Sequence, residues 1–167
     1  MSLLDPVLDL FRGKAVTIPP MDGALKPNTA LDDAEVVAAA LAPDNLALRN
    51  GLPIYSSHRE IRALGAEHAV LETCPADVSA IAVAEDGTLA VALEDGSLRI
   101  GETMIAGFNG ITALALHSGK LYVTNGSDHF RPGQWVSDLM HQNSAGSLWE
   151  VDVKTGARRK LAGGLAY

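Results

Sequence analysis

The residues best suited to chemistry lie in one short run, Asn125 to His129, with the sequence Asn-Gly-Ser-Asp-His. His129 can exchange a proton near neutral pH, so it is a candidate general base beside Asp128. A histidine in a solvated loop without a catalytic role is the competing interpretation. Asn125, taken by itself, is an ordinary Asn-Gly turn residue. This run therefore indicates a candidate pocket but no particular reaction.

The other reactive side chains form no motif. His58, His68, His117 and His141 lack the spacing of metal ligands, and we assign them no role. Cys74 is the single cysteine, so a disulfide within the chain is impossible and a buried, inert thiol is expected. The chemistry must therefore be sought in how the fold brings distant residues together.

A threefold repeat of short strands is expected to hold these residues in place. A repeat of this size, built from short strands and tight turns, is typical of a propeller blade. The expected strands are 44–49, 52–57, 59–64 and 69–73 in unit one, 78–85, 88–93, 97–101 and 103–107 in unit two, and 111–117, 120–125, 147–152 and 158–164 in unit three. An antiparallel sandwich is the alternative, but the shared order of strands and turns favours the propeller.

The turns support the same repeat. The first turn of each unit contains Gly51, Gly87 or Gly119, which are 36 and 32 residues apart. Each turn can adopt the positive φ that tight hairpins require. The first strand of each unit is apolar almost throughout, as expected for inner strands covered on both faces. We predict an all-β fold with about three four-stranded blades, at about 42–74, 78–107 and 111–164.

Unit three carries an insertion, 127–143, between its second and third strands. Four apolar residues share one face of a helix that would begin near Pro132. They are Trp135, Val136, Leu139 and Met140. We expect this helix to pack with that face over one end of the blades, where insertions often build a binding site. A lid that only covers apolar surface is the alternative.

The amino-terminal part is expected to lie outside the blades. Residues 2–12 have the pattern of a short amphipathic helix but lack the basic start and cleavage site of a signal peptide. A proline-rich connector follows, so we divide the chain into a lead-in at 1–33 and a half propeller at 34–167. Residues 34–41 suit a helix or a strand, and we favour a strand that joins the last blade and closes the ring.

The composition is that of an ordered globular protein. Of the 167 residues, 47% are hydrophobic, which is enough for a substantial core. The net charge of -7 argues against a nucleic-acid partner, because such a partner selects a basic surface. The sequence contains no apolar stretch of about 18 residues, so we expect no membrane span. The lack of a leader pattern favours a cytoplasmic location.

Two stretches resemble a known family. L-Y-V-T-N-G-S-D-H-F at 121–130, a helix, and then G-S-L-W-E-V-D and L-A-G-G-L-A-Y resemble the strictosidine synthase-like propellers. The lead-in at 19–35, P-P-M-D-G-A-L-K-P-N-T-A-L-D-D-A-E, is similar to that family as well. These proteins share a superfamily of six-bladed propellers with paraoxonases and gluconolactonases. The resemblance implies that this chain supplies the N-terminal half of such a ring.

The resemblance also implies a metal site. In the paraoxonase and gluconolactonase branches, carboxylates and asparagines hold a divalent cation, usually calcium, in the central channel. The matching ligands are Asp44, which is one methylene shorter than the family's glutamate, and Asn125. Without the family, Asp44 is a turn residue after Pro43. The implied ligand pocket is lined by Asn45, Ser127, Asp128 and His129.

Three functions follow from the resemblance. The first is a calcium-dependent hydrolase of a small-molecule lactone or ester, in which the ion polarises the carbonyl and stabilises the oxyanion. The second is a metal-free condensing enzyme of the strictosidine synthase type, with a carboxylate as acid and base. The third is a propeller without chemistry that binds small molecules or acts as a scaffold. Asn125 favours the first over the second, because strictosidine synthase has an aspartate there.

Three blades do not close a ring. The catalytic glutamate of strictosidine synthase and the remaining lactonase ligands belong to later blades, so we assign no catalytic residue here. This half alone is expected to be inactive. Its two open flanks should be covered either by a second copy of the half propeller, giving a dimer, or by a missing C-terminal half.

Overall fold

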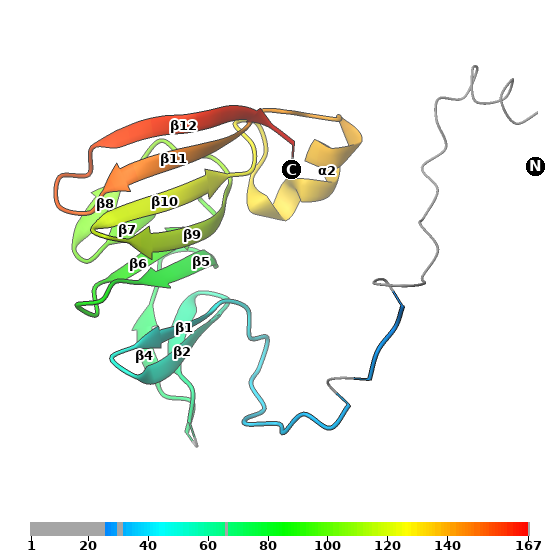
Figure 1. Cartoon of the computed structure of the whole chain (residues 1–167), viewed down its shortest axis with the longest axis vertical. Coiled ribbons are helices and arrows are strands. Elements are labelled where there is room, and N and C mark those ends of the chain that lie inside the picture. Colours follow the sequence, from blue (N-terminus) through cyan, green and yellow to red (C-terminus); the bar gives the residue numbers. More distant parts are fainter. Residues whose placement is uncertain (1–25, 30–31, 66, 167) are drawn as a thin grey trace, which may run out of the picture. The chain divides into compact units, whose positions relative to one another are not determined.

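The computed structural model describes residues 26–29, 32–65 and 67–166 (Figure 1). The chain divides into two compact units, Met1–Val37 and Ala38–Tyr167. The helix predicted over 2–12 lies outside the described residues. All regular structure described below belongs to the second unit.

The second unit is built from three four-stranded antiparallel sheets, so the all-β prediction is confirmed. We call these sheets blades one, two and three, since each is a meander in chain order and consistent with part of a propeller (Figure 1). Their strands are β1 (Leu46–Arg49), β2 (Leu52–Ser57), β3 (Glu60–Ala63), β4 (Val70–Thr73), β5 (Val78–Val83), β6 (Leu89–Leu93), β7 (Leu98–Ile100), β8 (Thr103–Ile105), β9 (Ile111–His117), β10 (Lys120–Asn125), β11 (Gly146–Asp152) and β12 (Arg158–Leu165).

Left-handed turn residues fix the hairpins between the first two strands of blades one and three. Asn50 and Gly51 have φ values of 52° and 78°, and Ser118 and Gly119 have values of 50° and 72°. Two consecutive positive φ angles are the backbone of the tight turn that matches the twist of paired strands. The predicted turn positions are therefore confirmed.

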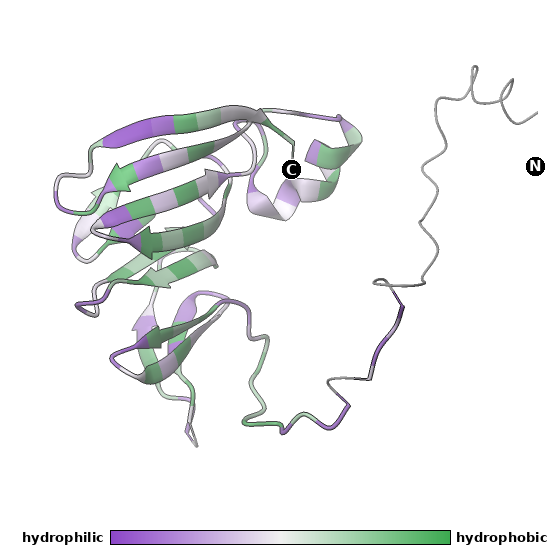
Figure 2. Ribbon diagram, in the orientation of Figure 1, coloured by the Kyte–Doolittle hydropathy of each residue, from purple (hydrophilic) through white to green (hydrophobic). Residues whose placement is uncertain are grey.

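Two apolar clusters join the blades. One lies between blades one and two and includes Ile54, Ile61 and Val91. The other lies between blades two and three and includes Leu98 and Val151. Figure 2 shows the hydrophobic residues concentrated in β5, β6 and β9, and β6 is buried at every position. The middle blade is thus covered on both faces, which is why its strands are apolar rather than alternating.

The insertion contains the predicted helix, but its apolar face is turned outward. A 3-10 turn, η2 (Pro132–Gln134), leads into α2 (Trp135–Met140). Asp138 is the buried side chain of α2 at 1% exposure, whereas Met140 is 77% exposed. The expectation that the apolar face packs on the blades is therefore wrong. The reason is that hydrogen bonds to the Asp138 carboxyl, described below, hold the polar face inward.

The strand predicted over 34–41 is also absent, since 34–40 form neither helix nor strand. A strand is stable only beside a hydrogen-bonded partner, and none of the sheets in the described residues pairs with this segment. Its last residue is held by one contact, in which the Ser57 hydroxyl donates to the Leu41 carbonyl oxygen at 2.8 Å.

In the described part of the chain, no helix is long and apolar enough to cross a membrane.

Candidate functional site

A polar cavity of about 330 Å³ lies where the three inner strands β1, β5 and β9 begin. Asp44 precedes β1, Ser79 lies at the start of β5, and Thr112 lies at the start of β9. Glu94 follows the end of β6, and its backbone N–H donates to the Asp77 carbonyl just before β5. Trp135 of the insertion adds an indole. The repeat therefore brings residues far apart in sequence to one side of the blades.

The chemistry of this cavity is acidic and hydroxyl-rich. It contains the carboxylates of Asp44 and Glu94 and the hydroxyls of Ser79 and Thr112, and none of the described residues that line it is Lys or Arg. The Ser79 hydroxyl oxygen is buried and has no hydrogen-bond partner in the structure. Because buried hydroxyls are normally satisfied, this unpaired oxygen is an exception among the described side chains. The Thr112 hydroxyl pairs with that of Thr124 at 3.0 Å.

Asp44 is held loosely at the rim. Its side chain is exposed, and one carboxylate oxygen accepts from the Asn45 amide at 3.1 Å. Asn45 itself is tied to Ser56, whose hydroxyl accepts from both the backbone N–H and the side-chain amide of Asn45 at 3.1 Å. The Asp44 carboxylate is thus placed by its neighbour but remains open to solvent and to a ligand.

Asn125 is a buried cross-link with 2% exposure. Its amide oxygen accepts from the backbone N–H groups of Asn109 at 3.2 Å and Gly110 at 2.8 Å. Its amide nitrogen donates to the Ser127 carbonyl at 3.1 Å and to the Asp128 carboxylate at 2.6 Å. Both lone pairs of the oxygen are occupied in this arrangement, so Asn125 holds the loop before β9 to the end of β10. It does not line the cavity that contains Asp44.

The base of the insertion is a second polar network, centred on two buried side chains. The Ser127 hydroxyl donates to the Asp138 carboxyl at 2.8 Å, and the Asn143 amide donates to the same oxygen at 2.7 Å. The Ser127 oxygen in turn accepts from the backbone N–H groups of His129 and Phe130, both at 3.1 Å. The sequence pattern did not identify Asp138 as a buried residue, because in the sequence it is a single acidic residue in an otherwise largely apolar helix.

The remaining predicted pocket residues are not brought together with Asp44 and Glu94. Asp128 and His129 have exposed side chains in the loop after β10, and Ser127 is buried in the network just described. Asn45, Ser127, Asp128 and His129 are all absent from the lining of the 330 Å³ cavity. Within the described ranges there is no group of three or more His, Cys, Asp or Glu side chains that could hold a metal ion.

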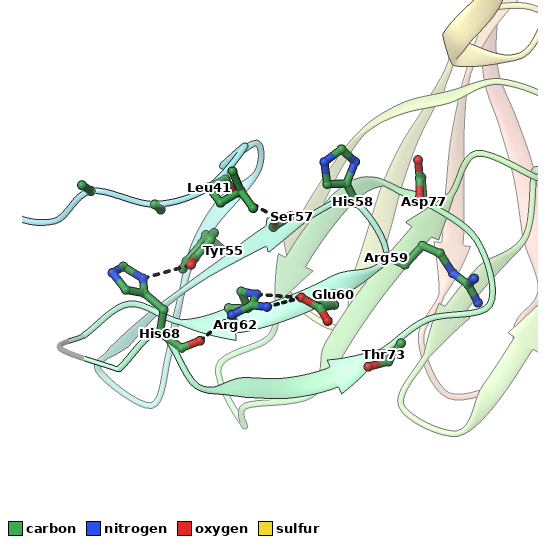
Figure 3. Close-up of a pocket in the computed structure, with 12 residues that line it drawn as sticks. Leu41, Tyr55, Ser57, His58, Arg59, Glu60, Arg62, His68, Thr73 and Asp77 are labelled. Carbon is green, nitrogen blue, oxygen red and sulfur yellow. Dashed lines mark hydrogen bonds and ion pairs between the residues drawn. The ribbon is translucent and has the colours of Figure 1, made fainter.

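A second cavity, of about 710 Å³, lies against blade one (Figure 3). Some of its polar groups are paired with one another. The Tyr55 hydroxyl and the His68 Nδ1 are 2.9 Å apart, and Arg62 forms an ion pair with Glu60. Arg62 also donates to the His68 carbonyl at 2.9 Å. We interpret this cavity as a groove between blade one and residues 39–41 rather than as a reactive site.

The cysteine has the inert environment that was expected. Cys74 is free and buried. Burial, and secondarily the nearby Glu72 carboxylate, raises the pKa of the Cys74 thiol, so the reactive thiolate is disfavoured.

Comparison with known proteins concerns the fold alone. No family profile and no curated protein matches the chain. The computationally designed protein Ika4 is similar in structure, with a TM-score of 0.50 and 15% identity over 77% of this chain and 78% of its own. The extracellular domain of a one-component system from B. thetaiotaomicron has a TM-score of 0.48 and 9% identity over 75% of this chain and 16% of its own. A protein of unknown function from Bacteroides caccae has a TM-score of 0.47, 16% identity, and coverage of 71% and 50%.

Proposed function

We propose that these blades are part of a strictosidine synthase-like, six-bladed propeller that binds a small organic molecule of the lactone or ester class. The ligand occupies the 330 Å³ cavity where the inner strands begin. The observation that carries this proposal is the convergence of two carboxylates, two hydroxyls and an indole, contributed by all three blades and the insertion, on one cavity. A concave site with few convergent polar groups is the usual form of a small-molecule site.

The Ser79 hydroxyl supports binding in particular. Its buried oxygen lacks a partner, and rotation of the hydroxyl toward the cavity that Ser79 lines would let a ligand carbonyl or hydroxyl supply one. The Trp135 indole is half-exposed at the same cavity and offers an apolar surface for the ligand's carbon skeleton. These two contacts define a polar and an apolar side of the proposed site.

Calcium-dependent hydrolysis is the second candidate. The presence of both Asp44 and Glu94 in the lining of one cavity favours it. Both carboxylates are hard oxygen donors of the kind calcium prefers, but calcium takes six to eight oxygen ligands. Asn125, the other implied ligand, has its amide oxygen occupied by two backbone N–H groups. The described residues therefore fit a partial site, in which Asp44 and Glu94 would hold the ion and further blades would complete it. The bound ion would supply electrophilic polarisation of the ester carbonyl.

The two tryptophans provide a direct test. Trp135 lines the cavity, whereas the Trp149 indole N–H donates to the Ser147 hydroxyl at 2.9 Å and its ring packs on the core. Trp149 is therefore an internal control in a ¹⁵N spectrum of the indole N–H signals. We expect δ-valerolactone to shift the Trp135 signal saturably and leave the Trp149 signal in place, and we expect Glu94→Gln to weaken the response. A Trp135→Phe variant assigns the signals.

Calcium chloride, titrated separately, distinguishes the candidates. A Trp135 shift with calcium that is lost in Asp44→Asn favours the hydrolase, whereas a response to δ-valerolactone alone favours a binding module. If neither probe moves the Trp135 signal, or if both indole signals move together, the site is not where we place it.

A further inference from the structure

The two junctions between blades follow the same packing rule, seen first between blades one and two. On β1, Ala47 pairs with Ile54 across the strands and joins the apolar cluster shared with blade two. On β5, Ile81 and Val83 belong to that same cluster. An inner strand of the earlier blade thus presents a small side chain to large side chains on the inner strand of the later blade.

The second junction repeats this arrangement. Ala80 and Ala82 lie on the opposite face of β5, because side chains alternate along a strand, and join the cluster shared with blade three. Leu114 and Leu116 of β9 pack against that cluster. Each inner strand therefore has an alanine face toward the following blade and a face of larger aliphatic residues toward the preceding one.

The two outer faces of the three-blade unit have no neighbouring blade among the described residues. Blade one exposes a face of the larger kind, and blade three exposes a face of the alanine kind. Leu46 and Leu48 of β1 point away from blade two, with exposures of 68% and 67%. Ala113 and Ala115 of β9 point away from blade two as well and are exposed. We define the leucine face by Leu46 and Leu48 and the alanine face by Ala113 and Ala115.

We propose that the alanine face of one copy of this chain docks on the leucine face of a second copy, and that the two copies close into a ring through two equivalent contacts. The contact would reproduce the small-against-large packing seen at both internal junctions. This assembly goes beyond the proposed function and does not depend on any ligand.

The number of blades selects two copies. The described residues of each copy form three blades. Head-to-tail contacts produce a closed ring only when the rotations sum to a full turn, and propellers close with about four to eight blades. One copy falls below this range, two copies give six blades, and three copies would exceed it.

The polar groups on the two faces are compatible with burial. On blade three, Lys120 pairs with Asp152 at 2.7 Å and Arg159 pairs with Glu150 at 3.3 Å. On blade one, the Glu60–Arg62 ion pair lines the 710 Å³ cavity drawn in Figure 3. These three ion pairs are each formed within one blade, so docking would not leave their charges unpaired.

Light scattering on the purified full chain tests the closed pair. We expect one species with twice the 17.5 kDa mass of one chain, independent of concentration. A monomer would overturn the proposal and leave the two faces to another occupant, such as further blades of a longer chain. Larger species that grow with concentration would overturn ring closure.

Charge-complementary variants test the faces themselves. Leu48→Lys and Ala115→Asp should each abolish pairing, because each introduces a charge into both contacts of the ring. Mixing the two variants should restore a pair, since one contact then joins the new lysine to the new aspartate and the other is unaltered. Met104→Lys is the matched control: its side chain is 56% exposed on the outermost strand of blade two, and pairing should persist.

Far-UV circular dichroism and thermal melting keep this test decisive. Variants that are folded but still paired when alone would overturn the assigned faces. A folded mixture that remains monomeric would overturn them as well. If Leu48→Lys does not fold, Leu46→Lys mixed with Ala113→Asp provides the same comparison on the neighbouring pair of positions.

Discussion

Blade two and the insertion of blade three bury opposite kinds of residue. In blade two, β6 is buried at all five positions and has an apolar cluster on each face. In the insertion, the buried side chains are Ser127 and Asp138, and the apolar residues of α2 are half-exposed or more. The comparison teaches that apolar periodicity predicts burial only where a second element is available to cover the apolar face.

The two regions must therefore respond differently to substitution. Blade two is stabilised by apolar area removed from water. A substitution that preserves the volume of a buried side chain should therefore change its stability least. The insertion is stabilised by hydrogen bonds between polar side chains. Its stability therefore depends on the presence of hydrogen-bond acceptors rather than on side-chain volume. Three substitutions rank these contributions from the largest to the smallest.

Leu98→Ala should have the largest effect. The Leu98 side chain is fully buried between blades two and three, and its truncation leaves a cavity. We expect a loss of about 2–5 kcal/mol in the free energy of unfolding, measured by urea denaturation. Met104→Ala on the neighbouring strand β8 is the matched control and should change it little, because Met104 is exposed. Equal effects would show that blade two is not covered on both faces.

Asp138→Ala should have an intermediate effect. It removes the acceptor of the Ser127 hydroxyl and of the Asn143 amide. The buried Ser127 hydroxyl is then left without an acceptor, whereas the Asn143 amide keeps its hydrogen bond to the Ser127 oxygen at 3.1 Å. We expect a loss of about 1–3 kcal/mol in the same measurement. Hydrogen exchange should also become faster over 127–143 and remain unchanged in blade two. Asp138→Asn retains one acceptor oxygen and should lose less. A wild-type exchange pattern in Asp138→Ala would contradict the anchoring role.

Leu139→Asp should have the smallest effect. This side chain is exposed on α2, so the new carboxylate remains in water. We expect a change within about 0.5 kcal/mol, as for surface substitutions generally. A loss of several kcal/mol would mean that the apolar face of α2 is covered in solution, and the contrast with blade two would then disappear.

The sheets could be predicted because their determinants are local. Strand boundaries came within about two residues of those observed, since alternating or continuous apolar runs and turn residues such as Asn50-Gly51 act over a few positions. The orientation of α2 could not be predicted in this way. Periodicity shows that Trp135 and Leu139 share a face, but it does not show which face the rest of the protein covers.

The candidate site was predictable only in part. Asp44 was identified and does line the cavity, but its companions Ser79 and Glu94 were not. These residues have no motif, because they lie at the ends of different strands and meet only when the blades stack. Asn125 was predicted as a metal ligand, and its hydrogen bonds to Asn109 and Gly110 were not predicted, because they depend on a loop whose path the sequence does not specify.

The insertion leaves and rejoins blade three at one pair of residues on adjacent strands. Asn125, the last residue of β10, is paired with Ser147 near the start of β11, so the intervening chain departs and returns at neighbouring positions. Its buried contacts are mainly polar and internal, made by Ser127, Asp138 and Asn143. A segment attached in this manner is modular: its length and composition can diverge while the blade beneath it keeps its register. Because Trp135 reaches the cavity from this segment, substitutions in the segment can change the lining of the cavity without changing the strands.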